Sequence, residues 1–169
     1  GSGVLPPVKS VDTALPTGRR TWLLWSLAAL ALLGVVRSAW LCDDAFITLR
    51  TVDNFVNGYG LTWNVDERVQ AYTHPLWMFL LSGLYVFTRE PFYTPLLASF
   101  VLTVLFLAGF VRWHAKAIVP AALALGALAV SKSFADYSTS GLENPLTHLL
   151  LCLGLWLHLD GSTTPRRFG

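Results

Sequence analysis

The chain has 169 residues, of which 54% are hydrophobic and only 13% are charged. Soluble globular domains usually carry about a quarter of charged residues, so this composition argues against a soluble domain and indicates an integral membrane protein. The net charge of +2 is too small to indicate nucleic-acid binding, and the sequence has no basic stripe with interleaved aromatic residues.

Residues 1–20 are expected to form a flexible cytoplasmic tail, because they contain three prolines and show no hydrophobic periodicity. The opening Gly-Ser-Gly is typical of a cloning remnant. The first membrane span is predicted at about 21–41, since this apolar run matches the roughly 20 residues that cross a bilayer. Tryptophans lie towards both of its ends, where aromatic belts form.

Two adjacent aspartates, Asp43 and Asp44, follow the predicted span directly. Two carboxylates at the rim of a hydrophobic segment cost energy, which favours a functional role over chance. Residues 45–57 then place apolar side chains at i, i+3 spacing with polar residues opposite, and this pattern predicts a short amphipathic helix on the membrane surface. Asp44 would be its N-cap, which leaves Asp43 for chemistry. The alternative is that both aspartates are only caps and rim charges.

Four further apolar stretches follow, at 75–88, 92–111, 117–131 and 145–159. The first of them would reach only about 21 Å as a helix, against a hydrocarbon core of about 30 Å, and is therefore predicted to lie at the interface. The chain would then cross the membrane four times and end in a cytoplasmic tail, with the spans at about 21–41, 92–111, 117–137 and 145–159 and the tail at 161–169. This arrangement places seven of the twelve Lys and Arg residues in the cytoplasm, whereas five spans would leave Arg112 and Lys116 outside.

The four-span topology brings a second acidic motif to the same outer face. This motif is S-T-S-G-L-E-N-P at 138–145, and it contains Glu143 between the third and fourth predicted spans. Both acidic motifs end an outward-going span. The carboxylates of Asp43, Asp44 and Glu143 are therefore expected to open onto one cleft at the outer membrane surface.

The run from Asp43 to Trp77 reads D-D-A-F-I-T-L-R…N-G-Y-G-L-T-W-N…E-R-V-Q-A-Y-T-H-P-L-W, and T-S-G-L-E-N-P-L follows at 139–146. As a set, these motifs resemble the terminal β-(1→2)-arabinofuranosyltransferases, a family within the GT-C superfamily of polyprenyl-phosphate-dependent glycosyltransferases. The resemblance covers about residues 20–160. Because family members run to several hundred residues, it implies that residues 21–160 are the N-terminal portion of a catalytic module.

The resemblance implies an all-α, polytopic membrane protein with GT-C-type transmembrane helices and juxtamembrane helices in the first extracytoplasmic loop. It also implies the reaction, in which a sugar, arabinofuranose, passes from a polyprenyl-phosphate donor to a cell-envelope glycan or glycoconjugate. The active site would face the outside of the bacterial plasma membrane. In this family an acidic residue just after the first span is the usual catalytic base, and a second acidic site follows the third span.

Candidate site residues follow from this chemistry. Asp43 is the first choice for the general base that removes the proton of the acceptor hydroxyl, Asp44 is the second, and Glu143 is the second acidic site. Arginine binds phosphate with a forked set of donors, and aromatic rings stack on sugars. The candidate substrate-binding residues are therefore Arg50, Arg68, Tyr72, His74 and Trp77. Each also has a plainer interpretation, as a local ion pair, a structural hydrogen-bonding group or an interfacial anchor.

No metal site is predicted, because three of the four histidines have no carboxylate or cysteine at ligand spacing. The cofactor requirement stays unknown, although two adjacent carboxylates can hold a divalent cation. Expected partners are the lipid-linked donor, the glycan acceptor and membrane lipids, without nucleic acid. Two rival functions remain open: a transporter or flippase of lipid-linked sugars, which favours carboxylates near mid-span, and a non-catalytic membrane assembly protein.

Overall fold

A computed structural model describes residues 17–67, 69 and 71–163 of the chain. Arg68, one of the predicted phosphate-binding residues, lies outside the described residues. Within the described part every regular element is an α-helix and no strand occurs, which confirms the all-α prediction. The helices are α1 (Thr17–Arg37), α2 (Asp43–Val56), α3 (Pro75–Thr88), α4 (Tyr93–His114), α5 (Ile118–Val130), α6 (Lys132–Tyr137) and α7 (Asn144–Thr163).

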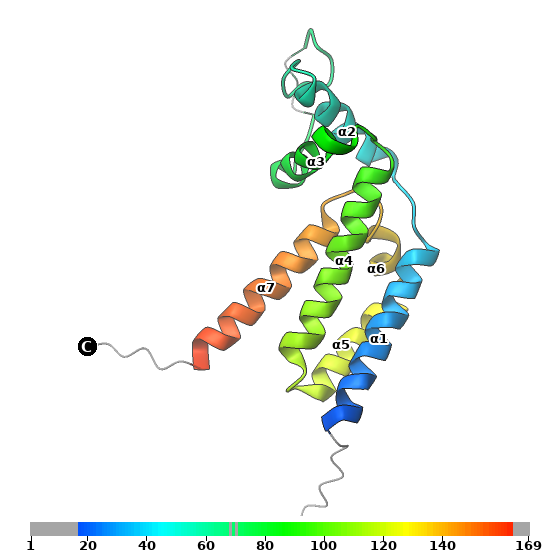
Figure 1. The fold of residues 1–169 in the computed structure, drawn as a ribbon, viewed down its shortest axis with the longest axis vertical. Helices are drawn as coiled ribbons and strands as arrows, with labels where there is room; N and C mark the ends of the chain where they lie inside the picture. Colours follow the sequence, from blue (N-terminus) through cyan, green and yellow to red (C-terminus); the bar gives the residue numbers. More distant parts are fainter. Residues whose placement is uncertain (1–16, 68, 70, 164–169) are drawn as a thin grey trace, which may run out of the picture.

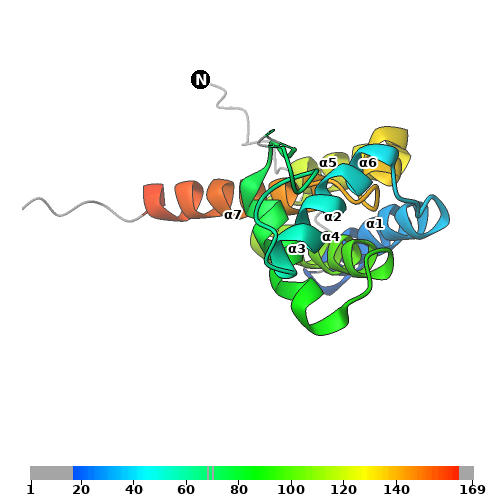
Figure 2. The ribbon, with the colours of Figure 1, turned by 90° about the horizontal axis from the view of Figure 1, so that it is seen from above.

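The longer helices form a bundle around α4, which packs against α1, α3, α5 and α7 (Figure 1). Helices α2 and α3 pack on one another, and they lie at one end of this bundle (Figures 1 and 2). One apolar core joins α1, α4, α5, α6 and α7, and a second core joins α2, α3 and the first half of α4. The chain thus places the segments that carry both acidic motifs near one end of the bundle.

Helix α4 has 22 residues and is the one described helix long and apolar enough to cross a membrane by length and composition. The apolar stretches of the other long helices are shorter, at Thr21–Arg37, Pro75–Thr88, Ile118–Val130 and Asn144–Leu159. A single helix of this kind is weak evidence for a membrane location, because the core helix of a soluble protein has the same properties. The four-span topology therefore stays a prediction.

Several predicted helix boundaries differ from the structure, and three of the differences have a bearing on the site. Helix α1 ends at Arg37 instead of residue 41, because the chain leaves the helix to pair the Cys42 N–H with the Ser140 carbonyl at 2.9 Å. The predicted span 117–137 breaks at Ser131, which has an extended backbone and caps α6 by accepting the Phe134 N–H at 3.2 Å. Helix α7 continues to Thr163, beyond the predicted end at 159.

The predicted N-cap of the surface helix is wrong. Cys42 occupies the N-cap position, and Asp43 and Asp44 both lie in the first turn of α2. Carboxylates are favoured in this turn, because the helix dipole is positive at its N-terminus. Helix α3 has the predicted bounds, and Pro75 stands at its first turn, where the missing proline N–H has no cost.

Three hydrogen bonds fix α2 against α3 and the loop that follows α2. The Tyr85 hydroxyl of α3 donates to the Asp53 carboxylate of α2 at 2.8 Å. Burial first, and then the bond to Asp53, raise the pKa of Tyr85, so this phenol stays a neutral donor. On α2, the Asn54 side chain donates to the carbonyls of Thr62 and Trp63, each at 2.9 Å, and so fixes the start of the following loop.

The predicted topology has a direct test in cysteine labelling of the complete gene product. Cys42→Ser and Cys152→Ala would remove the native thiols, and single cysteines would then be introduced as Lys116→Cys and Tyr59→Cys, two exposed positions in the structure. We expect a membrane-impermeant maleimide added to intact cells to label the cysteine at 59 and to spare the one at 116. Ready labelling at 116 before the cells are opened would contradict four spans.

Candidate active site

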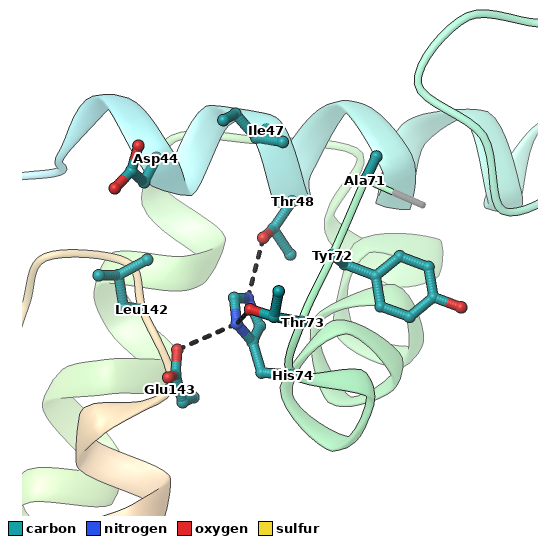
Figure 3. A pocket seen from close by; sticks show the side chains of 9 residues that line it. All are labelled: Asp44, Ile47, Thr48, Ala71, Tyr72, Thr73, His74, Leu142 and Glu143. Carbon is teal, nitrogen blue, oxygen red and sulfur yellow. Dashed lines mark hydrogen bonds and ion pairs between the residues drawn. The ribbon is translucent and has the colours of Figure 1, made fainter. Parts of the chain in front are cut away.

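A pocket of about 370 Å³ lies where three segments distant in sequence meet (Figure 3). Helix α2 forms one side, the segment before α3 forms another, and the loop before α7 closes the third. The lining residues are Asp44, Ile47, Thr48, Ala71, Tyr72, Thr73, His74, Leu142 and Glu143. The pocket therefore brings one carboxylate of the aspartate doublet together with the carboxylate of the second acidic motif.

His74 joins two walls of the pocket through both of its ring nitrogens. Its Nε2 lies 3.0 Å from the hydroxyl oxygen of Thr48 on α2, and its Nδ1 lies 3.2 Å from the Glu143 carboxylate (Figure 3). The Thr73 hydroxyl also lies 3.2 Å from Nδ1. In a neutral ring whose Nδ1–H donates to Glu143, Nε2 accepts a hydrogen bond from the Thr48 hydroxyl. A protonated ring would donate to both partners. In either state His74 fixes the direction of the Glu143 side chain, which is 40% exposed.

The loop 138–143 that carries Glu143 is held by its own backbone carbonyls. The Cys42 N–H donates to the Ser140 carbonyl at 2.9 Å, and the Trp77 indole N–H donates to the Gly141 carbonyl at 2.9 Å. The Thr103 hydroxyl of α4 donates to the Ser138 carbonyl at 3.4 Å. Three different elements thus bind one short loop, and the loop presents Glu143 at a fixed place.

Gly141 has two separate reasons to be glycine. Its φ of +84° is in the left-handed region that side chains disfavour, and it lies against the first turn of α2. A Cβ atom at this position would be 2.7 Å from the Cβ of Ala45 and 2.8 Å from Cδ2 of Leu41, inside the contact distance of real carbon atoms. In the S-G-L-E motif, the glycine is therefore explained by close packing against α2, and the glutamate by its place in the pocket.

Replacement of this glycine should disrupt the site. We expect Gly141→Ala to destabilise the complete gene product by about 2–3 kcal/mol, because about 1–2 kcal/mol of left-handed strain adds to the overpacking against α2. Thermal unfolding in detergent would measure the change. Gly126→Ala on α5 is the matched control, since nothing lies within 4 Å of its added Cβ. Equal unfolding temperatures for the two variants would show that the loop is not close-packed as described.

Of the aspartate doublet, only Asp44 lines the pocket. Asp43 is exposed one position earlier on α2, and neighbouring helical residues point about 100° apart. The pocket thus brings Asp44 and Glu143 together and leaves Asp43 outside its lining. Arg50 is exposed on α2 and is also absent from the lining.

The aromatic candidates have different positions. Tyr72 lines the pocket, with its ring directed away from Glu143 (Figure 3). Trp77 is 0% exposed and packs in the core with Met78 and Leu81, so the expectation that it stacks on a sugar is corrected. Its contribution is the indole hydrogen bond to the Gly141 carbonyl of the loop.

Thr48, like Thr73, is a polar pocket residue that the sequence interpretation did not single out. It is almost completely buried, and its hydroxyl contacts the imidazole of His74. The signal was present in the spacing, since Asp44 and Thr48 are four residues apart and share one face of a helix. No group of three His, Cys, Asp or Glu side chains suited to a metal ion occurs within the described residues.

The fold and site define a helical protein with a carboxylate-bearing pocket at one end of its bundle, a class of site suited to proton transfer at a hydroxyl group. The chain is 36% identical over 150 residues to the terminal β-(1→2)-arabinofuranosyltransferase of Mycobacterium tuberculosis, covering 79% of this chain and 24% of that relative. It is 31% identical over 128 residues to the protein of the same name from Corynebacterium glutamicum, covering 71% of this chain and 18% of that relative.

The chain is therefore homologous to the terminal β-(1→2)-arabinofuranosyltransferases, as the sequence motifs indicated. It spans about a quarter or less of the length of the curated relatives it matches. No protein-family model and no solved structure matches the chain.

Proposed function

We propose that this chain forms part of a GT-C membrane glycosyltransferase. The enzyme transfers arabinofuranose from a polyprenyl-phosphate donor to a hydroxyl group of a cell-envelope glycan, on the extracytoplasmic side of the bacterial plasma membrane. The observation that carries the proposal is the meeting of Asp44 and Glu143 in one pocket of a chain homologous to arabinofuranosyltransferases. The chemistry of the reaction explains why two carboxylates belong there.

The reaction forms a bond from the acceptor oxygen to the anomeric carbon of the sugar and breaks the bond from that carbon to the phosphate oxygen. The bonding electrons leave with the phosphate, and the proton of the acceptor hydroxyl passes to a base. Asp44 is the better candidate for this base than Asp43, because Asp44 lines the pocket and Asp43 does not. Glu143 is instead held by His74, so it suits binding and orientation of a sugar hydroxyl.

Exposed apolar side chains on the long helices support the membrane location. Leu97 of α4, Leu123 of α5 and Leu151 of α7 are each more than 60% exposed, and similar residues continue along α1. Soluble monomers rarely expose large apolar patches, and exposed apolar side chains on four helices suit a lipid environment. With these surfaces in lipid, the pocket lies at the edge of the bilayer, where the phosphate of a lipid-linked donor must lie.

The position of the carboxylates argues against the transporter alternative. A transporter is expected to place acidic groups near the middle of its spans, next to paired breaks in the helices. Asp44 lies in the first turn of α2, and Glu143 directly precedes α7, so both acids lie at helix ends. The non-catalytic alternative differs from the enzyme in its response to loss of these carboxylates.

Substitution of the doublet tests the assignment of the base. We expect Asp44→Asn to lower transfer of labelled arabinofuranose in membranes containing the complete gene product by about 10²–10⁴-fold, the usual contribution of a general base. Asp43→Asn is the matched control and should cost much less, because Asp43 is absent from the pocket lining. The larger loss in Asp43→Asn would return the base to Asp43, and no loss in either variant would favour the non-catalytic protein.

The role of His74 has its own test. We expect His74→Ala to lower the rate of transfer by roughly 10–100-fold, because Glu143 then loses a charge-assisted hydrogen bond of about 1.5–3 kcal/mol. His74→Gln keeps a donor for Glu143 and should retain more activity. A His74→Ala variant with the transfer rate of the wild type would contradict this role.

A further inference from the structure

A second cavity, of about 530 Å³, lies on the other side of Glu143, between α6 and the start of α7. Its lining residues are Leu128, Ser131, Ser133, Phe134, Tyr137, Leu142, Glu143, Asn144 and His148. It shares only Leu142 and Glu143 with the pocket around His74. The Glu143 side chain therefore stands between two separate spaces.

The break in the predicted third span builds the wall of this cavity. Because the chain turns at Ser131, α6 directs Phe134 into the core and leaves the Tyr137 ring 48% exposed. The Trp40 indole donates to the Asp136 carbonyl at 2.9 Å and holds α6 against the end of α1. The His148 ring lies beside Phe134, with ring centroids 5.5 Å apart. These contacts hold α6 and the start of α7, and with them the lining residues of the cavity, in place.

The chemistry of the second cavity suits a neutral carbohydrate. An exposed tyrosine ring can stack on the C–H face of a sugar, and serine, asparagine and glutamate side chains can bind its hydroxyl groups. No lysine or arginine stands among the lining residues described, and Lys132 of α6 is paired with Asp136. An uncharged glycan needs no cationic partner, so this lining can bind it through hydroxyl, amide and carboxylate groups alone.

We propose that the second cavity is the binding site of the acceptor glycan, a neutral hydroxyl-rich oligosaccharide, while the donor sugar occupies the pocket around His74. The inference rests on the proposed function and assigns its two substrates to two spaces. The end of the acceptor passes Glu143, which binds a hydroxyl group from each side, and its reacting hydroxyl reaches Asp44. Tyr137 is then a residue that determines acceptor binding and takes no part in the proton transfer.

The test uses the complete gene product, a polyprenyl-phosphate arabinofuranose donor and a neutral arabinofuranosyl oligosaccharide as the acceptor. We expect Tyr137→Ala to raise the KM for the acceptor about tenfold, with kcat and the KM for the donor within about twofold of the wild type. Tyr137→Phe keeps the ring and should stay near the wild type. Tyr93→Ala is the matched control, since Tyr93 is an exposed tyrosine outside both cavities.

A binding measurement separates this inference from the proposed function. Titration of the oligosaccharide into detergent-solubilised protein without donor should show binding that Tyr137→Ala weakens about tenfold and Tyr93→Ala does not change. That result supports the glycan site even if the protein fails to transfer arabinofuranose, in which case only the proposed function is wrong. Transfer with an unchanged acceptor KM in Tyr137→Ala, or a raised donor KM alone, would overturn the acceptor site and leave the proposed function intact.

Discussion

The hydrogen bond from the Trp77 indole to the Gly141 carbonyl joins the start of α3 to the loop before α7 and is the contact around which the pocket is arranged. The indole is buried, so the bond forms away from water and fixes the loop on the side of α3. Because Gly141 has no side chain, the first turn of α2 can pack closely against the same loop. Glu143 lies next to His74 because the loop is contacted by both Trp77 and α2.

A division of roles between the acidic groups follows from this arrangement. Glu143 is paired with His74, and Asp44 lines the same pocket from the first turn of α2. A carboxylate bound by an imidazole can position a hydroxyl group, whereas one open to the pocket can receive a proton. The two cavities beside Glu143 extend this division to the two substrates of a transfer reaction.

The helices and loops that form the site were predictable from the sequence. The directions in which their side chains point were not. The bounds of α3 were predictable because Pro75 marks its start and its length is set by the apolar run. The choice between Asp43 and Asp44 was not predictable, since it depends on the residue at which α2 begins, and one position rotates a side chain by about 100°. The burial of Trp77 and the turn at Ser131 likewise depend on contacts with residues far away in the chain.

The pairing of Cys42 with Ser140 joins positions 98 residues apart, and this distance along the chain has a consequence for biosynthesis. At the usual rate of about 5–20 residues per second, the ribosome needs roughly 5–20 seconds between these two positions. During that delay α2 and α3 can pack on one another through their shared core, while the carboxylate of Asp44 has no opposite wall. The nascent protein thus acquires its pocket late, after the first helices are already in place.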